Sequence, residues 1–301
     1  MPDEPTAFPA HGIRPSRYRL PEATRLGHVR LQIADLARSV AYYRDVIGLQ
    51  VLSERTGSAT MAAHNDAHAL LDLVELKGAA PVPPRGRLGL YHVAILLPDR
   101  AALGRFVTHL AGINERAGMS DHLVSEALYL TDPDGLGLEI YADRPRAMWQ
   151  ARDRQLAMTT EPLDVTALVE SAHGVPWTGA PAGTTIGHVH LHVGDLAQGA
   201  TFYHDGLGFD KTVWEYPGAL FLAAGGYHHH VGTNTWARNA ESARANEARL
   251  LEWEILVPAA SDVQALQDNL TVGGIAATRA ETSLLTQDPW GTRVRVRASL
   301  P

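Results

Sequence analysis

Cysteine is absent from the 301 residues of this chain. Its absence excludes disulfide frameworks, thiolate zinc sites, iron–sulfur clusters and cysteine nucleophiles. Any metal site must therefore use nitrogen and oxygen ligands, and the sequence offers 15 histidines and 33 acidic residues for this purpose.

Basic residues are in the minority, and long apolar runs are missing. The chain has 26 Lys and Arg, a net charge of −7 and no basic block, so we expect no nucleic-acid partner. No stretch approaches the ~18 apolar residues of a membrane span, and the Pro-rich N-terminus lacks the apolar core of a signal peptide. We therefore expect a soluble cytoplasmic protein with no membrane partner.

An internal repeat accounts for most of the chain. GHVRLQIADLARSVAYYRDVIGLQVL begins at Gly27, and GHVHLHVGDLAQGATFYHDGLGFDKT begins 160 positions later at Gly187. At the same offset LYHVAILLP corresponds to LLEWEILVP. The repeat predicts an N-terminal tail (1–23), a first domain (24–150), a linker (151–182) and a second domain (183–301).

Each predicted domain contains two units with the order β-α-β-β-β. Residues 26–33 alternate apolar and polar side chains, as a half-buried strand does, and Asp35 is placed to cap a helix that Gly48 ends. Three short strands follow, and the pattern restarts at Tyr91. The predicted fold class is α+β, in which the two units of each domain join into one curved mixed sheet around a cleft.

Strand alternation places two imidazoles and one carboxylate on the polar faces of three strands. The apolar residues of GHVRLQI point toward the helices, so His28 points the other way, and His92 and Glu139 occupy comparable positions on LYHVAILL and LGLEIYA. If these faces line one cleft, the three side chains form a 2-His-1-carboxylate triad that leaves metal positions open. The alternative for each histidine is a surface or hydrogen-bonded strand residue.

These motifs resemble a known family. The GHVxLxVxDLxxSxxFYxxxLG opening, the LYHVAI strand and the SEALYLTDPDGLGLEIYADRP ending are similar to the vicinal oxygen chelate superfamily, specifically its extradiol ring-cleavage dioxygenases of the catechol 2,3-dioxygenase type. The resemblance covers nearly the whole chain. It implies two tandem vicinal-oxygen-chelate domains, with iron ligands at His28, His92 and Glu139.

The same resemblance implies the chemistry. The metal is expected to be Fe(II), although Mn(II) suits the same hard ligands, and no organic cofactor is required. The substrates are a small aromatic diol and O2, and the reaction is extradiol (meta) cleavage of the ring. The family also implies a homo-oligomer.

Three further positions carry family roles. Tyr129 corresponds to a tyrosine near the metal, and His122 to a histidine that contacts substrate. His68 corresponds to the acid/base histidine, with His64 as its competitor. Read from the residues alone, AAHNDAH around His64 and His68 is equally consistent with a polar hairpin.

The second domain departs from the pattern. In two-domain relatives the complete triad usually lies in the C-terminal domain, but here His188 is followed by Glu252 and Arg295 at the corresponding positions. We hypothesise a relic cleft in which Arg295 pairs with Glu252. An alternative metal site would combine His190, His230 and Glu252, with His188 nearby.

Other activities on this scaffold remain open at the level of sequence. A glyoxalase-like isomerase or transferase would use the same fold with a fourth protein ligand. A non-catalytic ligand-binding protein, as in bleomycin-type resistance, would carry no metal, and a structural duplicate would act through protein partners.

Overall fold

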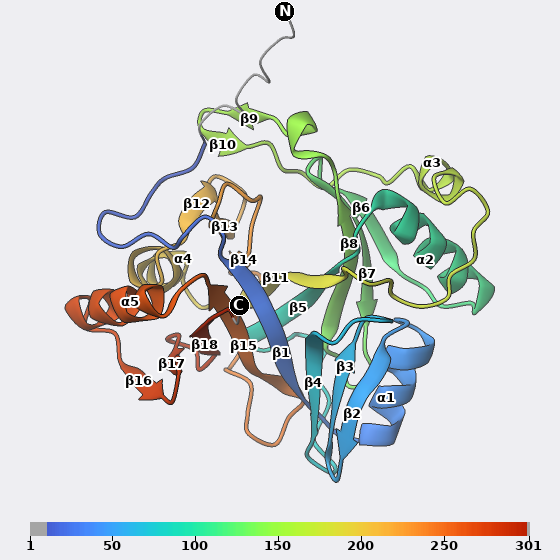
Figure 1. Cartoon of the computed structure of the whole chain (residues 1–301), viewed down its shortest axis with the longest axis horizontal. Helices are drawn as coiled ribbons and strands as arrows, with labels where there is room; N and C mark the ends of the chain where they lie inside the picture. The colour runs from blue at the N-terminus through green and yellow to red at the C-terminus, as the bar shows by residue number, and fades with distance from the viewer. Residues whose placement is uncertain (1–10, 300–301) are drawn as a thin grey trace, which may run out of the picture.

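The computed structural model describes residues 11–299 (Figure 1). Residues 1–10 of the predicted tail and the last two residues of the predicted second domain lie outside this range. The described part of the tail runs along the second half of the chain, where Ile13 bridges to Lys211 and Leu20 is buried in the core. Among residues 11–299, no helix has the length and apolar character needed to cross a membrane.

Four β-α-β-β-β units follow one another, as the sequence predicts. The first comprises β1 (Arg25–Ile33), α1 (Leu36–Asp45), β2 (Gln50–Arg55), β3 (Ser58–Ala62) and β4 (Ala69–Glu75). The second comprises β5 (Gly89–Leu96), α2 (Arg100–Gly112), β6 (Gly118–Asp121), β7 (Ser125–Thr131) and β8 (Gly137–Asp143). The predicted cap is confirmed, since the Asp35 carboxylate accepts a hydrogen bond from the Arg38 amide at the start of α1.

The second half repeats this order after a connecting segment. The connection contains η1 (Arg146–Met148), β9 (Ala151–Arg152), β10 (Gln155–Leu156) and α3 (Val165–Glu170). The third unit comprises β11 (Thr185–His192), α4 (Leu196–Ala200), the π-helical turn η2 (Thr201–Gly206), β12 (Asp210–Val213), β13 (Ala219–Ala223) and β14 (Val231–Asn234). The fourth comprises β15 (Arg249–Val257), α5 (Ala260–Val272), β16 (Ala277–Ala280), β17 (Ser283–Gln287) and β18 (Arg293–Ala298).

The units pair across the two halves of the chain. One eight-stranded mixed sheet has the order β16-β17-β18-β15-β1-β4-β3-β2, so it joins the first unit to the fourth. The other has the order β12-β13-β14-β11-β5-β8-β7-β6, so it joins the second unit to the third. In Figure 1, α1 and α2 lie on one side of the molecule and α4 and α5 on the other.

This pairing corrects the expectation that the two units of each half share a sheet. In each sheet the two units are joined at the centre by an antiparallel pair of their first strands, β1 with β15 and β5 with β11. Because all four units begin with a strand of similar pattern, each offers an edge that any other can pair with. The sequence pattern within a unit therefore does not determine its partner.

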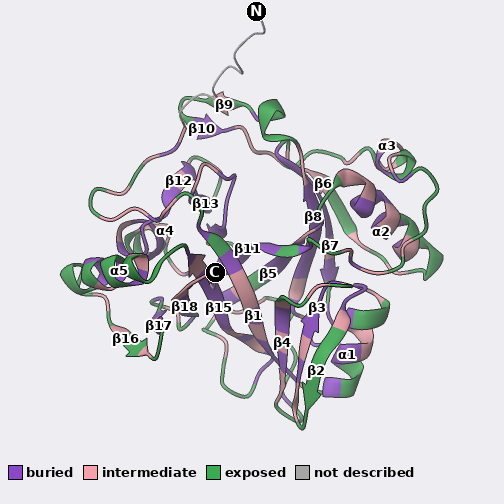
Figure 2. Ribbon diagram, viewed as in Figure 1, coloured by how far each residue is buried: buried purple, intermediate pink, exposed green. Residues whose placement is uncertain are grey.

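The core lies between the sheets and their helices. Val29, Leu31 and Ile33 of β1 are fully buried, which confirms that the apolar side of the GHVRLQI strand points inward. Figure 2 shows the central strands as largely buried and the helices as exposed on their outer faces. The polar faces of the same strands are thereby turned toward the concave sides of the sheets.

Candidate metal centre and its pocket

Three donor side chains meet on the concave face of the sheet that joins the second and third units. His92 lies on β5, Glu139 on β8 and His188 on β11, and their donor atoms all lie within 4.8 Å of one another. His92 Nε2 is 2.9 Å and His188 Nε2 is 3.1 Å from the same carboxylate oxygen of Glu139. The two Nε2 atoms are 3.3 Å apart.

The strand register explains the convergence. Ala94 on β5 pairs with Glu139 on one side and with His188 on the other. These two side chains therefore flank Ala94 on one face of the sheet, and His92 points to the same face because it lies two residues earlier. Ala94 is fully buried and has a small side chain, so it leaves the space above it to the three donors.

The glycine before His188 makes room for a tyrosine hydroxyl. Gly187 precedes His188 in the GHV motif, and a Cβ at that position would lie 1.8 Å from the Tyr141 hydroxyl oxygen. Tyr141 in turn shares a 2.7 Å hydrogen bond with the Tyr227 hydroxyl. Any larger residue at 187 would displace this pair of tyrosines, of which Tyr141 has its ring centroid 5.0 Å from that of His188.

The electrostatics suit a cation. Burial lowers the pKa of His188 to about 4, so its imidazole is neutral near pH 7. Burial raises the pKa of Glu139, but the two imidazoles outweigh this effect and hold it well below its ordinary value. A buried carboxylate that faces two ring nitrogens presents lone pairs to one point, which is the arrangement that a bound metal ion requires.

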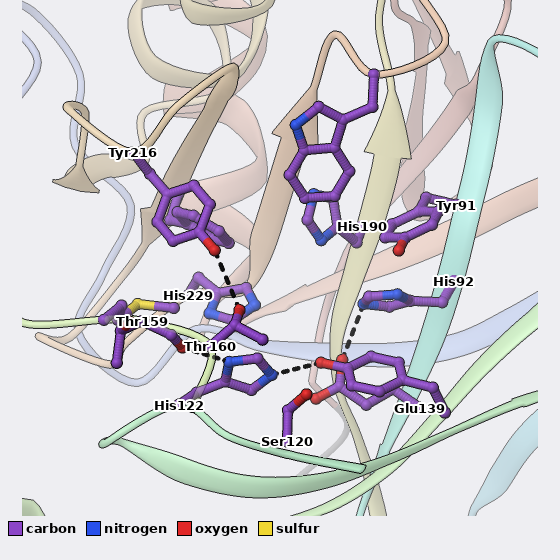
Figure 3. Close-up of a pocket in the computed structure, with 14 residues that line it drawn as sticks. Tyr91, His92, Ser120, His122, Glu139, Thr159, Thr160, His190, Tyr216 and His229 are labelled. Atoms are coloured by element: carbon purple, nitrogen blue, oxygen red, sulfur yellow. Dashed lines mark hydrogen bonds and ion pairs between the residues drawn. The ribbon is translucent and has the colours of Figure 1, made fainter. Parts of the chain in front are cut away.

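A cavity of about 240 Å³ opens beside this cluster, and His92 and Glu139 form part of its wall (Figure 3). Its remaining wall is largely aromatic, with Tyr91, Tyr216, Phe221 and Trp236. A small planar molecule fits between aromatic rings of this kind.

The predicted residues His122 and Tyr129 both line the cavity. His122 Nδ1 lies 2.6 Å from the Thr159 carbonyl oxygen, which can only accept, so this nitrogen carries the proton. His122 Nε2 must then accept from the Tyr129 hydroxyl at 2.5 Å. Burial raises the pKa of Tyr129 well above its ordinary value, so the tyrosine keeps the proton it donates.

His28 does not join the cluster, which corrects the expected ligand set. It lies on β1 in the other sheet, where its Nδ1 is 3.1 Å from Glu254 and its Nε2 is 3.4 Å from Asp72. The hydrogen bond to Glu254 raises the pKa of the imidazole. Because β11 and not β1 pairs with β5, His188 occupies the position expected for its repeat counterpart His28.

His68 also lies away from the cavity. Its side chain is 90 % exposed and bonds to Asp66 in the loop between β3 and β4. The competing residue His64 is half-buried, and its amide donates to the Ala180 carbonyl. The structure therefore agrees with the polar-hairpin interpretation of this segment. The first unit belongs to the other sheet, so neither histidine lines the cavity.

The second cleft contains the predicted ion pair. Arg295 Nε donates to Glu252 at 2.7 Å, and the guanidinium makes a second contact of 3.2 Å with the same carboxylate. The alternative site of His190, His230 and Glu252 is not assembled, because β15 carries Glu252 in one sheet and β11 carries His190 in the other. His230 instead accepts a hydrogen bond from the Ala224 amide through its Nδ1.

Two further histidines line the cavity: His229, which the sequence did not assign to a site, and His190, which it assigned only to the alternative site with His230 and Glu252. His190 and His229 are buried and line the cavity, and burial holds the pKa of each well below its ordinary value. None of the residues that the structure describes forms a hydrogen bond with His190 Nε2. The available signal was the repeat itself, since His229 lies beside His228, the counterpart of His68.

Comparison with known proteins identifies the family. The family model described as Glyoxalase/Bleomycin resistance protein/Dioxygenase superfamily matches residues 25–140 and 185–295. The chain is 44 % identical over 273 residues to a catechol-2,3-dioxygenase of Bacillus subtilis (strain 168), covering 89 % of this chain and 95 % of the relative.

Solved structures share the fold at low sequence identity. A candidate dioxygenase from Bacillus subtilis subsp. subtilis str. 168 superposes with a TM-score of 0.65 at 11 % identity, covering 94 % of this chain and 87 % of the other. Glyoxalase I from Zea mays superposes with a TM-score of 0.54 at 17 % identity, covering 91 % and 92 %.

Proposed function

Since the chain belongs to the Glyoxalase/Bleomycin resistance protein/Dioxygenase superfamily, we propose that it is an extradiol dioxygenase, which uses O2 to cleave the ring of a catechol-type diol. The observation that carries this proposal is the convergence of His92, Glu139 and His188 beside a small aromatic cavity. The 44 % identity to a catechol-2,3-dioxygenase over nearly the full length supports the same reaction.

We assign His92, Glu139 and His188 as the metal ligands. Two imidazole nitrogens and a carboxylate oxygen on one side of an ion suit Fe(II), and also Mn(II). The bound metal would supply coordination of the two diol oxygens and of O2, together with electron transfer between them. Both oxygen atoms enter the product as the ring C–C bond beside the diol breaks, so the reaction consumes one O2 per diol and needs no organic cofactor.

The chain's own residues orient the substrate. The aromatic rings of Tyr91, Phe221 and Trp236 enclose a planar ring and exclude water from it. Tyr129 and His122 form a hydrogen-bonded pair that stands beside Glu139 in the cavity. The Tyr129 hydroxyl donates its one hydrogen to His122, so its oxygen can only accept a hydrogen bond from a bound ligand.

We further propose that the repeats keep the predicted boundaries, 24–150 and 183–301, and that the protein is a cytoplasmic homo-oligomer. The family resemblance supports the assembly. The net charge of −7 supports the absence of a nucleic-acid partner.

Anaerobic loading with Fe(II), followed by catechol in air-saturated buffer, tests the function. We expect O2 uptake matched to the appearance of a yellow ring-opened semialdehyde. The His188→Ala variant should do neither, whereas His28→Ala, its repeat counterpart in the other sheet, should do both. A wild-type protein that binds one metal per chain but consumes no O2 with catechol or substituted catechols would contradict the proposal.

A further inference from the structure

A chain of three side chains leads from the end of β8 to the cavity wall. Asp143 lies at the end of β8, and one of its carboxylate oxygens is 2.8 Å from His228 Nε2. His228 Nδ1 is in turn 2.7 Å from His229 Nδ1. His228 is fully buried, whereas the Asp143 side chain is 27 % exposed.

The hydrogen-bond directions follow from Asp143. An ionised carboxylate can only accept, so His228 Nε2 must carry a proton. In a neutral imidazole the other nitrogen is then an acceptor, and His228 Nδ1 accepts from His229 Nδ1. The proton on His229 is thus held on Nδ1, and its Nε2 keeps a lone pair.

The remaining nitrogen of His229 is the one available to the cavity. His229 forms part of the cavity wall (Figure 3), and its ring lies 4.0 Å from that of His188 between centroids. The ring of Phe221 lies 4.9 Å from it, so its orientation is also held by packing. A lone pair at this position can accept a hydrogen bond from a ligand that carries a donor hydrogen.

We propose that Asp143 and His228 are positioning residues that fix His229 in the Nδ1–H tautomer, so that its Nε2 accepts a hydrogen bond from a hydroxyl group of the bound ligand. The role in accepting from a diol rests on the proposed function. The tautomer itself does not, because the hydrogen bonds that fix it lie within the protein. Residues of this kind orient an imidazole without touching the substrate.

Nitrogen-15 NMR of histidine-labelled, Zn(II)-loaded protein reads the tautomer directly, since Zn(II) is diamagnetic and supports no turnover. We expect His229 to show a protonated Nδ1 and an unprotonated Nε2. In Asp143→Ala, His228 loses its fixed acceptor, and we expect a mixture of both tautomers at His229. Asp143→Glu should restore the single form.

Tyr227→Phe is the matched control. The Tyr227 hydroxyl donates to the same carboxylate at 3.2 Å but is not part of the chain, so its removal should leave the His229 tautomer unchanged. A wild-type His229 protonated on Nε2, or a tautomer unaffected by Asp143→Ala, would overturn the positioning role.

Ligand titration tests the acceptor role. Catechol should shift the Nε2 resonance of His229, and 1,2-dimethoxybenzene, which has no hydroxyl hydrogen, should not. No shift with bound catechol would overturn this role. In the Fe(II) enzyme, Asp143→Ala should lower kcat by about tenfold with unchanged iron content, which is the size expected for one charge-assisted hydrogen bond. A protein with the expected tautomer but no O2 uptake would fail the proposed function alone.

Discussion

His92 Nε2 and His188 Nε2 lie 3.3 Å apart, although the two residues are 96 positions apart in the chain and belong to different repeats. The antiparallel pair of β5 and β11 creates this proximity, with His92 opposite His190 and Ala94 opposite His188. The candidate metal centre therefore exists only where the two halves of the protein meet.

The ligand assignment predicts a contrast between the two repeat counterparts. His188→Ala should reduce iron retention and kcat by more than ~100-fold, since even the outer partners of a metal ligand are worth about 10–100-fold. His28→Ala should leave both near wild type, because His28 bonds to Glu254 in the other sheet. Iron analysis and O2 uptake measure the two effects. Equal losses in both variants would refute the assignment.

Arg295→Ala should leave ring cleavage near wild type and destabilise the fold. Glu252 is only 8 % exposed at its side chain, and removal of the guanidinium leaves its carboxylate without its partner. We expect a loss of about 1–3 kcal/mol in the free energy of unfolding. Urea denaturation measures it, and Arg295→Met with Glu252→Met should recover part of the loss. A large loss of activity would move the chemistry to this cleft.

Tyr129→Phe tests the donor in the cavity. The variant keeps the ring but removes the hydroxyl that donates to His122, and we expect kcat to fall about 10–100-fold with iron content unchanged. Tyr216→Phe is the control, because the Tyr216 hydroxyl lies 3.1 Å from Thr160 in the outer wall. Similar kcat values for the two variants would argue against a special role for Tyr129.

Because the His230 imidazole is buried, we predict that the protein loses stability in acid. Burial lowers the pKa of this imidazole to about 3, and its Nδ1 must stay unprotonated to accept from the Ala224 amide. Between an unfolded pKa near 6.5 and the folded value, the unfolded state binds the additional proton. The free energy of unfolding should thus fall by about 1.4 kcal/mol per pH unit for this group as pH decreases from 6.5 toward 3.

Denaturation of the metal-free protein between pH 7 and pH 5 measures this slope. His230→Asn keeps an acceptor for the Ala224 amide and cannot titrate. The slope should therefore decrease by about 1.4 kcal/mol per pH unit, which is the contribution of one proton. Identical slopes for the variant and the wild type would mean that His230 is protonated in the folded protein.

The pairing of units predicts that neither half folds alone. Residues 1–182 would leave β1 and β5 without their antiparallel partners, and residues 183–301 would leave β11 and β15 in the same condition. Each fragment should lack a cooperative unfolding transition by circular dichroism. Co-expression of the two should restore the transition and metal binding, whereas an independently stable fragment would contradict this prediction.

The sequence by itself determined the units and most of the site. Period-two alternation and helix caps are local signals, so the four β-α-β-β-β units, the buried face of β1 and the Asp35 cap could be predicted. The inward placement of His92 and Glu139 follows from strand alternation within one unit. The Arg295–Glu252 pair follows from alternation and opposite charge.

Only the tertiary structure decided which units share a sheet. The first strands of all four units have similar patterns, and the preference of β5 for β11 is a sum of many contacts between distant parts of the chain. That choice replaced His28 by His188 and left His68 exposed. It also brought His229 into the cavity and set Asp143 behind His228, because a site between two units contains residues that neither unit's sequence places together.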